Sequence, residues 1–160
     1  MVSLFDQASL AWEEGDVKKA FELFHEAANQ GDKNSQVNLG YCYDEGVGTK
    51  KNKRKAMYWY KKAAQKGDLA AYTNIAIYYS SIGNFNQAKR WYLDALKKGC
   101  KDAALGLAKL GLEGKVNLSR ADILEYLQIV IDAEGMVEVC VADQEEAHLL
   151  LDQCDSHVIL

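Results

Sequence analysis

The residue types most suggestive of chemistry lie between Asp44 and Lys55, where the sequence reads DEGVGTKKNKRK. Two glycines followed by threonine and lysine are the residue types that hold phosphate groups in nucleotide-binding loops. Such a loop, however, needs four residues between its glycines and a lysine directly before serine or threonine. Here a single residue separates Gly46 from Gly48, and Thr49 precedes the lysines. We therefore predict that these glycines turn the chain between two helices.

Five cations follow within six residues: Lys50, Lys51, Lys53, Arg54 and Lys55. We expect them at the turn and at the start of the next helix, where positive charge costs up to about 1 kcal/mol. The sequence favours a solvated turn, and an electrostatic contact with an acidic partner is the alternative. Nucleic acid is not expected as a partner, because no basic groove lined with aromatic residues accompanies the run.

Residues that could catalyse a reaction or bind a metal are scattered. The repeat pattern brings no serine or cysteine near any of the three histidines, His25, His148 and His157. The four cysteines, Cys42, Cys100, Cys140 and Cys154, lack the short spacing that zinc sites use. The acidic residues Asp143, Glu145 and Glu146 fit the first turn of a helix. The sequence therefore predicts no enzyme, no metal site, no cofactor and no small-molecule substrate.

Composition and charge indicate the kind of protein that holds these residues. The chain has 160 residues, of which 49% are hydrophobic and 26% charged, and it has no proline, which is typical of a helical domain. No run of about 18 apolar residues could span a membrane, and the N-terminus does not resemble a secretory signal, so we expect a cytoplasmic protein. The charge is −5 over residues 1–32, +7 over 33–66, +4 over 67–120 and −10 over 121–160. This asymmetry favours encounter with a charged partner.

A repeat of 32 to 36 residues organises the chain, and four glycines mark it: Gly31, Gly67, Gly99 and Gly135. Eleven residues before each glycine stands Ala20, Ala56, Ala88 or Leu124. The places three, four and seven residues further on share one helix face with it. In the second and third units these places hold Trp59, Tyr60 and Ala63, then Trp91, Tyr92 and Ala95. An earlier helix precedes each of these, so we predict helical hairpins whose turns are alternately short and long.

The second unit, from Ser35 to Gly67, closely resembles the Sel1-like repeat, a branch of the tetratricopeptide-like (TPR-like) helical repeats. The residues that carry the resemblance are Leu39, Gly40, Tyr43, Gly46, Gly48, Ala56, Trp59, Tyr60, Ala63, Ala64 and Gly67. The third unit is nearer to the tetratricopeptide spacing, and the fourth has Gly111 in the tyrosine place and lacks both aromatic residues. The resemblance implies an alpha-alpha superhelix, a curved stack of antiparallel helix pairs that binds proteins and acts as a scaffold.

The predicted fold is therefore all-α, a right-handed solenoid of about four antiparallel helix hairpins with a C-terminal capping helix. Residues 1–135 would form the repeats, and residues 136–160 would form a cap of the same domain. In that cap, Asp143 is a candidate for the residue that begins the helix, with Glu146 three residues on. The stretch 136–142 reads as either helical or extended.

The first helix of each hairpin should line the concave face, and the residues beside its core stripe should meet a partner. In repeat register these residues are Phe5, Trp12, Val37, Asn38, Tyr41, Asp44, Thr73, Asn74, Ile77, Ser80, Leu105, Lys109 and Leu112. Most are apolar, which suits an amphipathic helix or an extended peptide. The alternative is that the C-terminal segment covers part of this face.

These observations predict a non-enzymatic module that binds a partner protein or peptide through the concave face. A specific alternative is an inhibitor or immunity-type protein that neutralises a basic toxin or effector, which the acidic residues 121–160 would suit. A nucleic-acid binder and a hydrolase are further alternatives, and the sequence gives less support to each.

Overall fold

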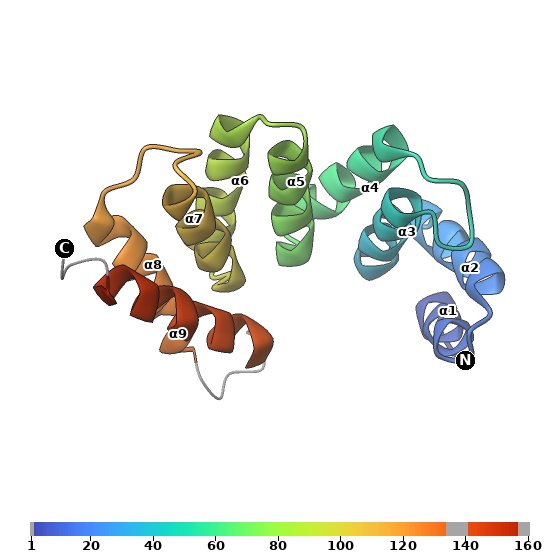
Figure 1. Cartoon of the computed structure of the whole chain (residues 1–160). Coiled ribbons are helices and arrows are strands. Elements are labelled where there is room, and N and C mark those ends of the chain that lie inside the picture. Colours follow the sequence, from blue (N-terminus) through green and yellow to red (C-terminus); the bar gives the residue numbers. More distant parts are fainter. Residues whose placement is uncertain (1, 134–140, 157–160) are drawn as a thin grey trace. The chain divides into compact units, whose positions relative to one another are not determined.

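A computed structural model of the chain describes residues 2–133 and 141–156 (Figure 1). Over these residues the chain forms nine α-helices and no strand. It divides into two compact units, residues 1–75 and residues 76–160. The prediction of an all-α fold built from antiparallel helix hairpins is confirmed. None of the helices, as far as the structure describes them, is long and apolar enough to cross a membrane.

Unit 1 contains α1 (Leu4–Glu13), α2 (Val17–Asn29), α3 (Lys33–Glu45) and α4 (Lys53–Gln65), and the first part of α5 (Leu69–Ser81) up to Ile75. Successive helices from α1 to α4 pack against each other. Each of them begins at a polar residue whose side chain accepts a hydrogen bond from the backbone of the first turn: Ser3, Asp16, Asp32 and Asn52. These caps satisfy N–H groups that a helix start leaves without a partner.

The turn between α3 and α4 confirms the prediction for its two glycines. Gly46 and Gly48 have φ angles of 77° and 67°, in the left-handed region that glycine adopts without steric cost. A Cβ atom on Gly48 would lie 2.2 Å from the carbonyl oxygen of Val17. The glycine therefore lets the long turn lie directly against the start of α2.

The core of unit 1 alternates small residues with aromatic rings, as the repeat pattern predicts. Ala56 and Ala63 on α4 are 1% and 0% exposed, and Trp59 and Tyr60 between them are 6% and 2% exposed. The ring of Tyr60 lies against Gly40 of α3, where a Cβ atom would come within 2.6 Å of two ring carbons. The absence of a side chain at Gly40 is what allows this ring to pack between the two helices.

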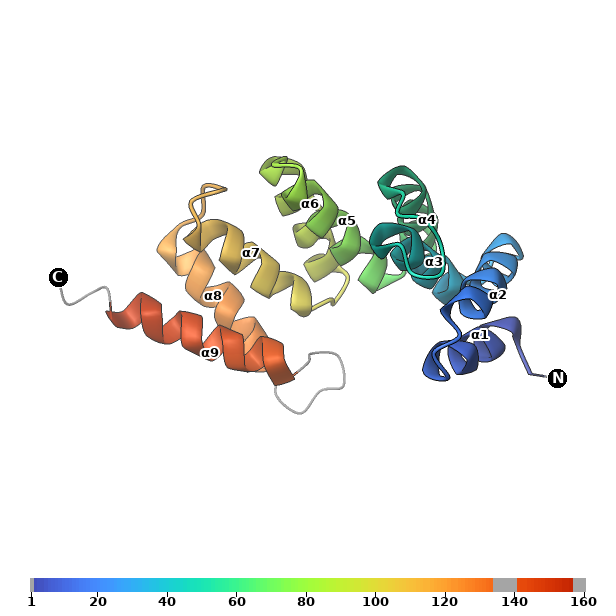
Figure 2. The same cartoon turned by 45° about the vertical axis from the view of Figure 1, so that its right-hand side comes forward.

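Unit 2 contains the rest of α5, then α6 (Phe85–Lys97), α7 (Asp102–Leu112), α8 (Arg120–Ile131) and α9 (Val141–Ser156). Helix α6 packs on α7, α7 on α8, and α9 packs mainly on α8 with a smaller contact to α7. Figures 1 and 2 both show α9 running alongside α8. The core of this end contains Leu105, Ala108, Leu127, Val130 and Ala147.

Helix α9 is the predicted C-terminal helix, but it begins earlier than the capping pattern indicated. The helix starts at Val141, so Asp143 lies inside its first turn, and the prediction that Asp143 begins the helix is wrong. Glu146, the proposed partner in that cap, instead accepts a hydrogen bond from Lys109 of α7. Of the stretch 136–142, residues 136–140 lie outside the described residues.

Candidate protein-binding surface

Three aromatic residues of unit 1 form an accessible surface on α1 and α3. Phe5 and Trp12 of α1 both contact the buried ring of Phe24 on α2, with ring centroids 6.1 and 6.3 Å apart. Trp12 also meets Tyr41 of α3 edge-on at 6.0 Å. Phe5 and Trp12 are half-buried, whereas Tyr41 is 44% exposed. We call Phe5, Trp12 and Tyr41 the aromatic surface.

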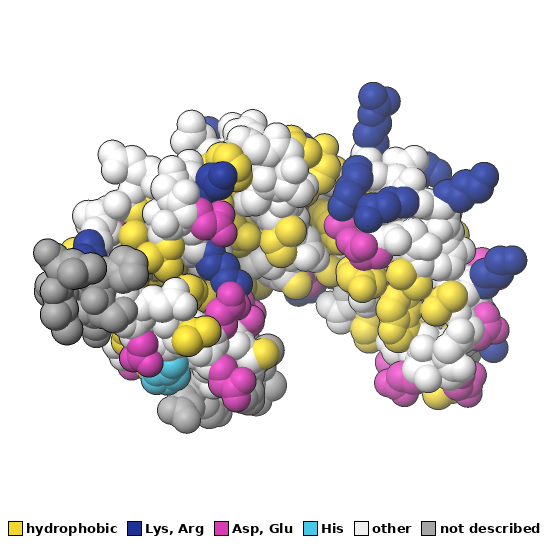
Figure 3. Space-filling model, in the orientation of Figure 1, with side chains coloured by type: hydrophobic (Ala, Val, Ile, Leu, Met, Phe, Trp, Pro, Cys, Tyr) yellow, Lys and Arg dark blue, Asp and Glu magenta, His cyan; other side chains and the backbone are white. Residues whose placement is uncertain are grey.

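The spacing of α1 explains why these rings lie at the edge of the core. Ala8 and Ala11 are 0% and 2% exposed and let α1 approach α2 closely. Phe5 and Trp12 lie on the adjoining stripe of the same helix, three residues before Ala8 and one residue after Ala11, so their rings reach past the small residues. Figure 3 shows hydrophobic side chains gathered on this unit over α1 and α3. Tilted packing of both α1 rings against Phe24, and edge-on packing of Trp12 against Tyr41, fixes their orientation.

The remaining predicted residues of unit 1 are half-buried: Val37, Asn38, Asp44, Thr73 and Asn74. The Thr73 hydroxyl donates a hydrogen bond to the carbonyl of Ala70 within α5. The Asp44 carboxylate forms an ion pair with Lys53 across the α3–α4 turn. Thr73 and Asp44 therefore already take part in contacts within the unit.

In unit 2 the prediction fails for Leu105. This residue is 4% exposed and belongs to the core cluster with Leu127 and Ala147, so it cannot line an open face. Lys109, one turn further along α7, donates to the Glu146 carboxylate of α9 at 2.6 Å. Helix α9 thus occupies this side of α7, as the alternative of a covering C-terminal segment anticipated for this position.

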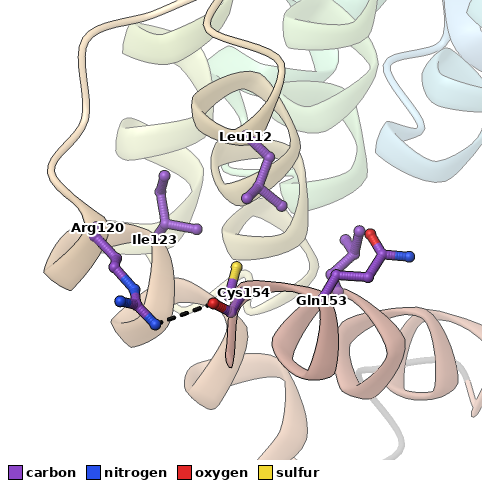
Figure 4. Close-up of a pocket in the computed structure, with 6 residues that line it drawn as sticks. Leu112, Arg120, Ile123, Gln153 and Cys154 are labelled. Atoms are coloured by element: carbon purple, nitrogen blue, oxygen red, sulfur yellow. Dashed lines mark hydrogen bonds between the residues drawn. The ribbon is translucent and has the colours of Figure 1, made fainter. Parts of the chain in front are cut away.

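The other predicted residues of unit 2 are accessible to different degrees. Ile77 of α5 is 53% exposed and Leu112 of α7 is 41% exposed, whereas Ser80 is half-buried. Leu112 borders a cavity of about 510 Å³ between α7, α8 and α9, which Ile123, Leu150 and Cys154 also line. Figure 4 shows Arg120 beside this cavity, with its Nη2 donating to the carbonyl oxygen of Cys154 at 3.0 Å.

This cavity was not predicted from the sequence, because it exists only where α9 packs back against α7 and α8. The fourth repeat has lost the aromatic pair that identifies the earlier ones, so its register gave no sign of such a space. The apolar residue Ile123 near the start of α8, four residues before the buried Leu127, was the available signal.

The basic turn has a partial structural explanation. Lys53 pairs with Asp44, Lys51 pairs with Glu45 at 3.4 Å, and the Lys55 ammonium lies 5.0 Å from the centre of the Tyr43 ring. Asp44 and Glu45 end α3, where negative charge is unfavourable, and Lys53 begins α4, where positive charge is unfavourable. Because the two helices are antiparallel, these ends are neighbours, and the misplaced charges of one helix neutralise those of the other.

The two histidines that the structure describes lie in different surroundings. His25 packs between the rings of Phe21 and Trp59 and contacts the Asn29 amide, which is a structural environment. His148 is exposed on α9, and His157 lies outside the described residues. Among the described residues, no group of three or more His, Cys, Asp or Glu side chains could hold a metal ion. Burial raises the pKa of the Cys42 thiol to about 11, so this cysteine is not an activated nucleophile.

A family model for the Sel1 repeat matches residues 7–32, 33–68 and 70–100. The chain belongs to the Sel1 repeat family. These matches coincide with the first three predicted repeats. Sel1 repeats are generally non-enzymatic modules for protein–protein interaction.

Solved structures support the fold. A Sel1 repeat protein from Oxalobacter formigenes superposes with a TM-score of 0.71 at 24% identity, over 94% of this chain and 71% of that one. The c5321 protein, a protective antigen of uropathogenic Escherichia coli, gives 0.75 at 25% identity, over 94% of this chain and 32% of that one.

Among curated proteins, a putative sel1-like repeat-containing protein of Acanthamoeba polyphaga mimivirus is 29% identical over 62% of this chain and 25% of its own length. The Sel1 chain described here therefore spans about a quarter of this relative.

Proposed function

We propose that this Sel1 protein is a non-enzymatic interaction module that binds a partner protein or peptide through the side of α1 and α3 that carries the aromatic surface. The observation that carries the proposal is the packing of Phe5 and Trp12 on the buried Phe24, and of Tyr41 on Trp12. Large rings held in fixed orientations at a protein surface lose little entropy on binding, and tryptophan and tyrosine are the residues enriched at binding hot spots.

The proposed partner segment presents an apolar side chain to Trp12 and Tyr41. An amphipathic helix and an extended peptide both meet this requirement. Beside Phe5 lies a cavity of about 720 Å³ between the start of α1 and the end of α2, which could receive a further apolar group. The half-buried amides of Asn38 and Asn74 are proposed to hydrogen-bond to the backbone of the partner. In unit 2, Ile77 and Leu112 are proposed as additional contacts.

The experiment begins with affinity purification from cell extract and identification of the captured protein. Its affinity is then measured by calorimetry for the wild type and for Tyr41→Ala, Trp12→Ala and Leu149→Ala. Leu149 is 59% exposed on α9, so its replacement removes a similar apolar side chain away from the aromatic surface. We expect Tyr41→Ala and Trp12→Ala to weaken binding about tenfold or more, and Leu149→Ala to leave it unchanged.

Circular dichroism must show that all three variants keep the wild-type helix content. Affinities of Tyr41→Ala and Trp12→Ala that match the wild type would refute the proposed surface. Catalytic turnover of the captured protein by this chain would refute the non-enzymatic assignment.

A second candidate is an inhibitor that neutralises a basic toxin or effector. It is supported by the acidic character of residues 121–160, within which Glu125, Asp132, Glu145 and Asp152 are exposed. It requires that the captured partner be strongly basic and that co-expression of this chain suppress its toxicity. Cytoplasmic localisation is part of both candidates and is tested by imaging a fluorescent fusion.

A further inference from the structure

Helix α4 carries an exposed aromatic residue surrounded by cations. Tyr58 is 53% exposed, and the four positions one helical turn from it, three and four residues to either side, hold Arg54, Lys55, Lys61 and Lys62. Residues at these separations are surface neighbours about 5–6 Å apart on a helix. The Lys62 ammonium lies 4.9 Å from the centre of the Tyr58 ring. We call these five residues the α4 basic face.

These charges are not neutralised within the unit. Asp44 and Glu45 are occupied by Lys53 and Lys51, and no acidic residue occurs between Gly46 and Gly67. Within the part of the chain that the structure describes, Arg54 and Lys61 have no ion pair. Figure 3 shows Lys and Arg side chains gathered where α4 lies, and Asp and Glu side chains where α1 lies.

The fold does not require these cations. The repeat places α6 in the same register 32 residues later, with Ala88 and Ala95 buried as Ala56 and Ala63 are. At the places of Arg54, Lys55, Lys61 and Lys62, helix α6 has Asn86, Gln87, Leu93 and Asp94. At the place of Tyr58, helix α6 has Arg90. A helix with the same buried alanines thus forms with one cation and one carboxylate on this face instead of four cations. The cations of α4 therefore serve something other than packing.

We propose that the α4 basic face is a second docking site, which binds an acidic segment of a partner protein. The outer side of a single helix is convex, so it offers no enclosed pocket for a small anion. It suits a chain that runs along it with carboxylates about two turns apart, because Arg54 and Lys62 are about 12 Å apart along the helix axis. An apolar side chain between those carboxylates would pack on the Tyr58 ring.

The distribution of charge favours a short acidic segment over an extended polyanion. Exposed acidic residues also occur on α1, at its C-terminal end and on α2 within the same unit, among them Glu13, Glu14, Glu22 and Glu26. At physiological salt, exposed charges act over about 8 Å. A segment of a few helical turns meets only the cations, whereas a membrane surface or a long nucleic acid also meets these carboxylates. Binding of single-stranded nucleic acid also draws on several stacking platforms, and Tyr58 offers one.

The test uses the full chain and a fluorescent helical peptide of about 14 residues that contains Glu, Leu and Ala, with Glu on one face at intervals of three and four residues. Binding is followed by anisotropy at about 50 mM and about 300 mM salt. We expect saturable binding at low salt and clearly weaker binding at high salt, because screening shortens the range of the attraction. An analogue with Gln in place of Glu should not bind.

The decisive variant is Arg54→Glu with Lys61→Glu, and the matched control is Arg90→Glu with Lys97→Glu. Both control residues are exposed on α6, and both doubles change the net charge equally. We expect the α4 double to weaken peptide binding at least about tenfold and the α6 double to stay within about twofold. Tyr58→Ser should weaken binding about threefold, and Tyr58→Phe should preserve it. All substitutions are on exposed positions, and helix content is verified by circular dichroism.

Three outcomes would overturn the proposal. The first is equal loss in both doubles, which would indicate nonspecific attraction. The second is tighter binding to an oligothymidine or to vesicles rich in phosphatidylserine than to the Glu peptide. The third is no peptide binding at low salt. Tyr41→Ala should leave peptide binding intact, so failure of this site and failure of the proposed aromatic surface can be told apart.

Discussion

Replacing Gly40 with alanine should destabilise the protein although alanine is the better helix former. Gly40 lies within α3, and its own backbone is helical. A methyl group there would lie 2.6 Å from the Cδ1 and Cε1 atoms of Tyr60 and 3.2 Å from Cγ. Ordinary contacts between carbon atoms are about 3.5–4.0 Å. The ring or the α4 helix must therefore move by about 1 Å.

Two opposing free energies set the expected magnitude. Alanine in place of glycine stabilises a helix by about 1 kcal/mol. Inserting a methyl group into a packed core costs about 1–3 kcal/mol, and the upper end applies because Tyr60 is 2% exposed and has no open space beside it. The net expectation is a loss of about 2 kcal/mol in the free energy of unfolding. For a chain of this length that corresponds to a fall of about 4–8 °C in Tm.

The assay is urea and thermal unfolding followed by circular dichroism and by tryptophan fluorescence, in which Trp12 and Trp59 report unit 1 and Trp91 reports unit 2. Asn86→Ala, at an exposed position of α6, controls for helix propensity and should be neutral or slightly stabilising. In the double variant Gly40→Ala with Tyr60→Leu, the alanine should cost little, giving a coupling free energy of about 2 kcal/mol. A Tm of Gly40→Ala equal to or above that of the wild type would refute the packing argument.

Three further perturbations follow from the burial and charge of particular residues. Trp59→Ala should lower the free energy of unfolding by about 3–5 kcal/mol, measured by chemical unfolding. Trp91→Ala should lower it clearly less, because Trp59 is 6% exposed whereas Trp91 is half-buried. Equal losses in the two variants would contradict this reasoning. Exchanging the pair as Asp44→Lys with Lys53→Asp should raise stability by about 1 kcal/mol, since each charge then suits its own helix end, and either single reversal should lower Tm. Burial raises the pKa of Cys42 to about 11 and that of Tyr92 to about 12. The contribution of these neutral groups to the free energy of unfolding is therefore fully present below about pH 9. It should fall progressively as the pH rises from about 9 to about 12, because the unfolded chain then loses these protons more readily than the folded one. Cys42→Ala should flatten the first part of that fall, and a denaturation midpoint constant from pH 8 to pH 11 would show that the groups do not titrate as expected.

Much of the hairpin architecture was predictable because it depends on local chemistry. Gly48 stands where only a residue without a side chain fits, and Gly46 has a left-handed φ of 77° that favours glycine. The alternation of Ala56, Trp59, Tyr60 and Ala63 fixes one buried face of α4 whatever the neighbouring repeats do. Such patterns are readable because glycine conformation and helix periodicity act over a few residues.

The errors concern contacts between segments distant in sequence. Leu105 was assigned to an open face because its register is that of Val37, and only the docking of α9 buries it. Asp143 was assigned as a cap because nothing local distinguishes it from a residue in the first turn. Tyr58 was overlooked although a signal existed: with Trp59 and Tyr60 inside, position 58 must face outward, and its neighbours one turn away are all cations.

Two glycines, Gly40 and Gly106, each lie against a tyrosine ring. They indicate what determines which neighbouring helix such a ring packs on. Tyr60 lies on Gly40 of the first helix of its own hairpin, whereas Tyr92, at the same repeat place, lies on Gly106 of α7, the helix that follows. In the hairpin of Tyr92 the place of Gly40 is taken by Ala76, which is buried and carries a methyl group that glycine lacks. The ring therefore packs where a glycine leaves room.

The dependence of ring packing on glycine also indicates why, in the Gly40→Ala variant, the Tyr60 ring cannot move to another neighbouring helix. The place of Gly106 on the helix that follows α4 is held by Asn74, which carries a side chain where Gly106 has none. Tyr60 therefore has a glycine to pack on in α3 and none at the place in α5 that corresponds to Gly106. A tyrosine stands at this repeat place in both hairpins. The position of glycine on the first helices determines which neighbouring helix the tyrosine ring packs on.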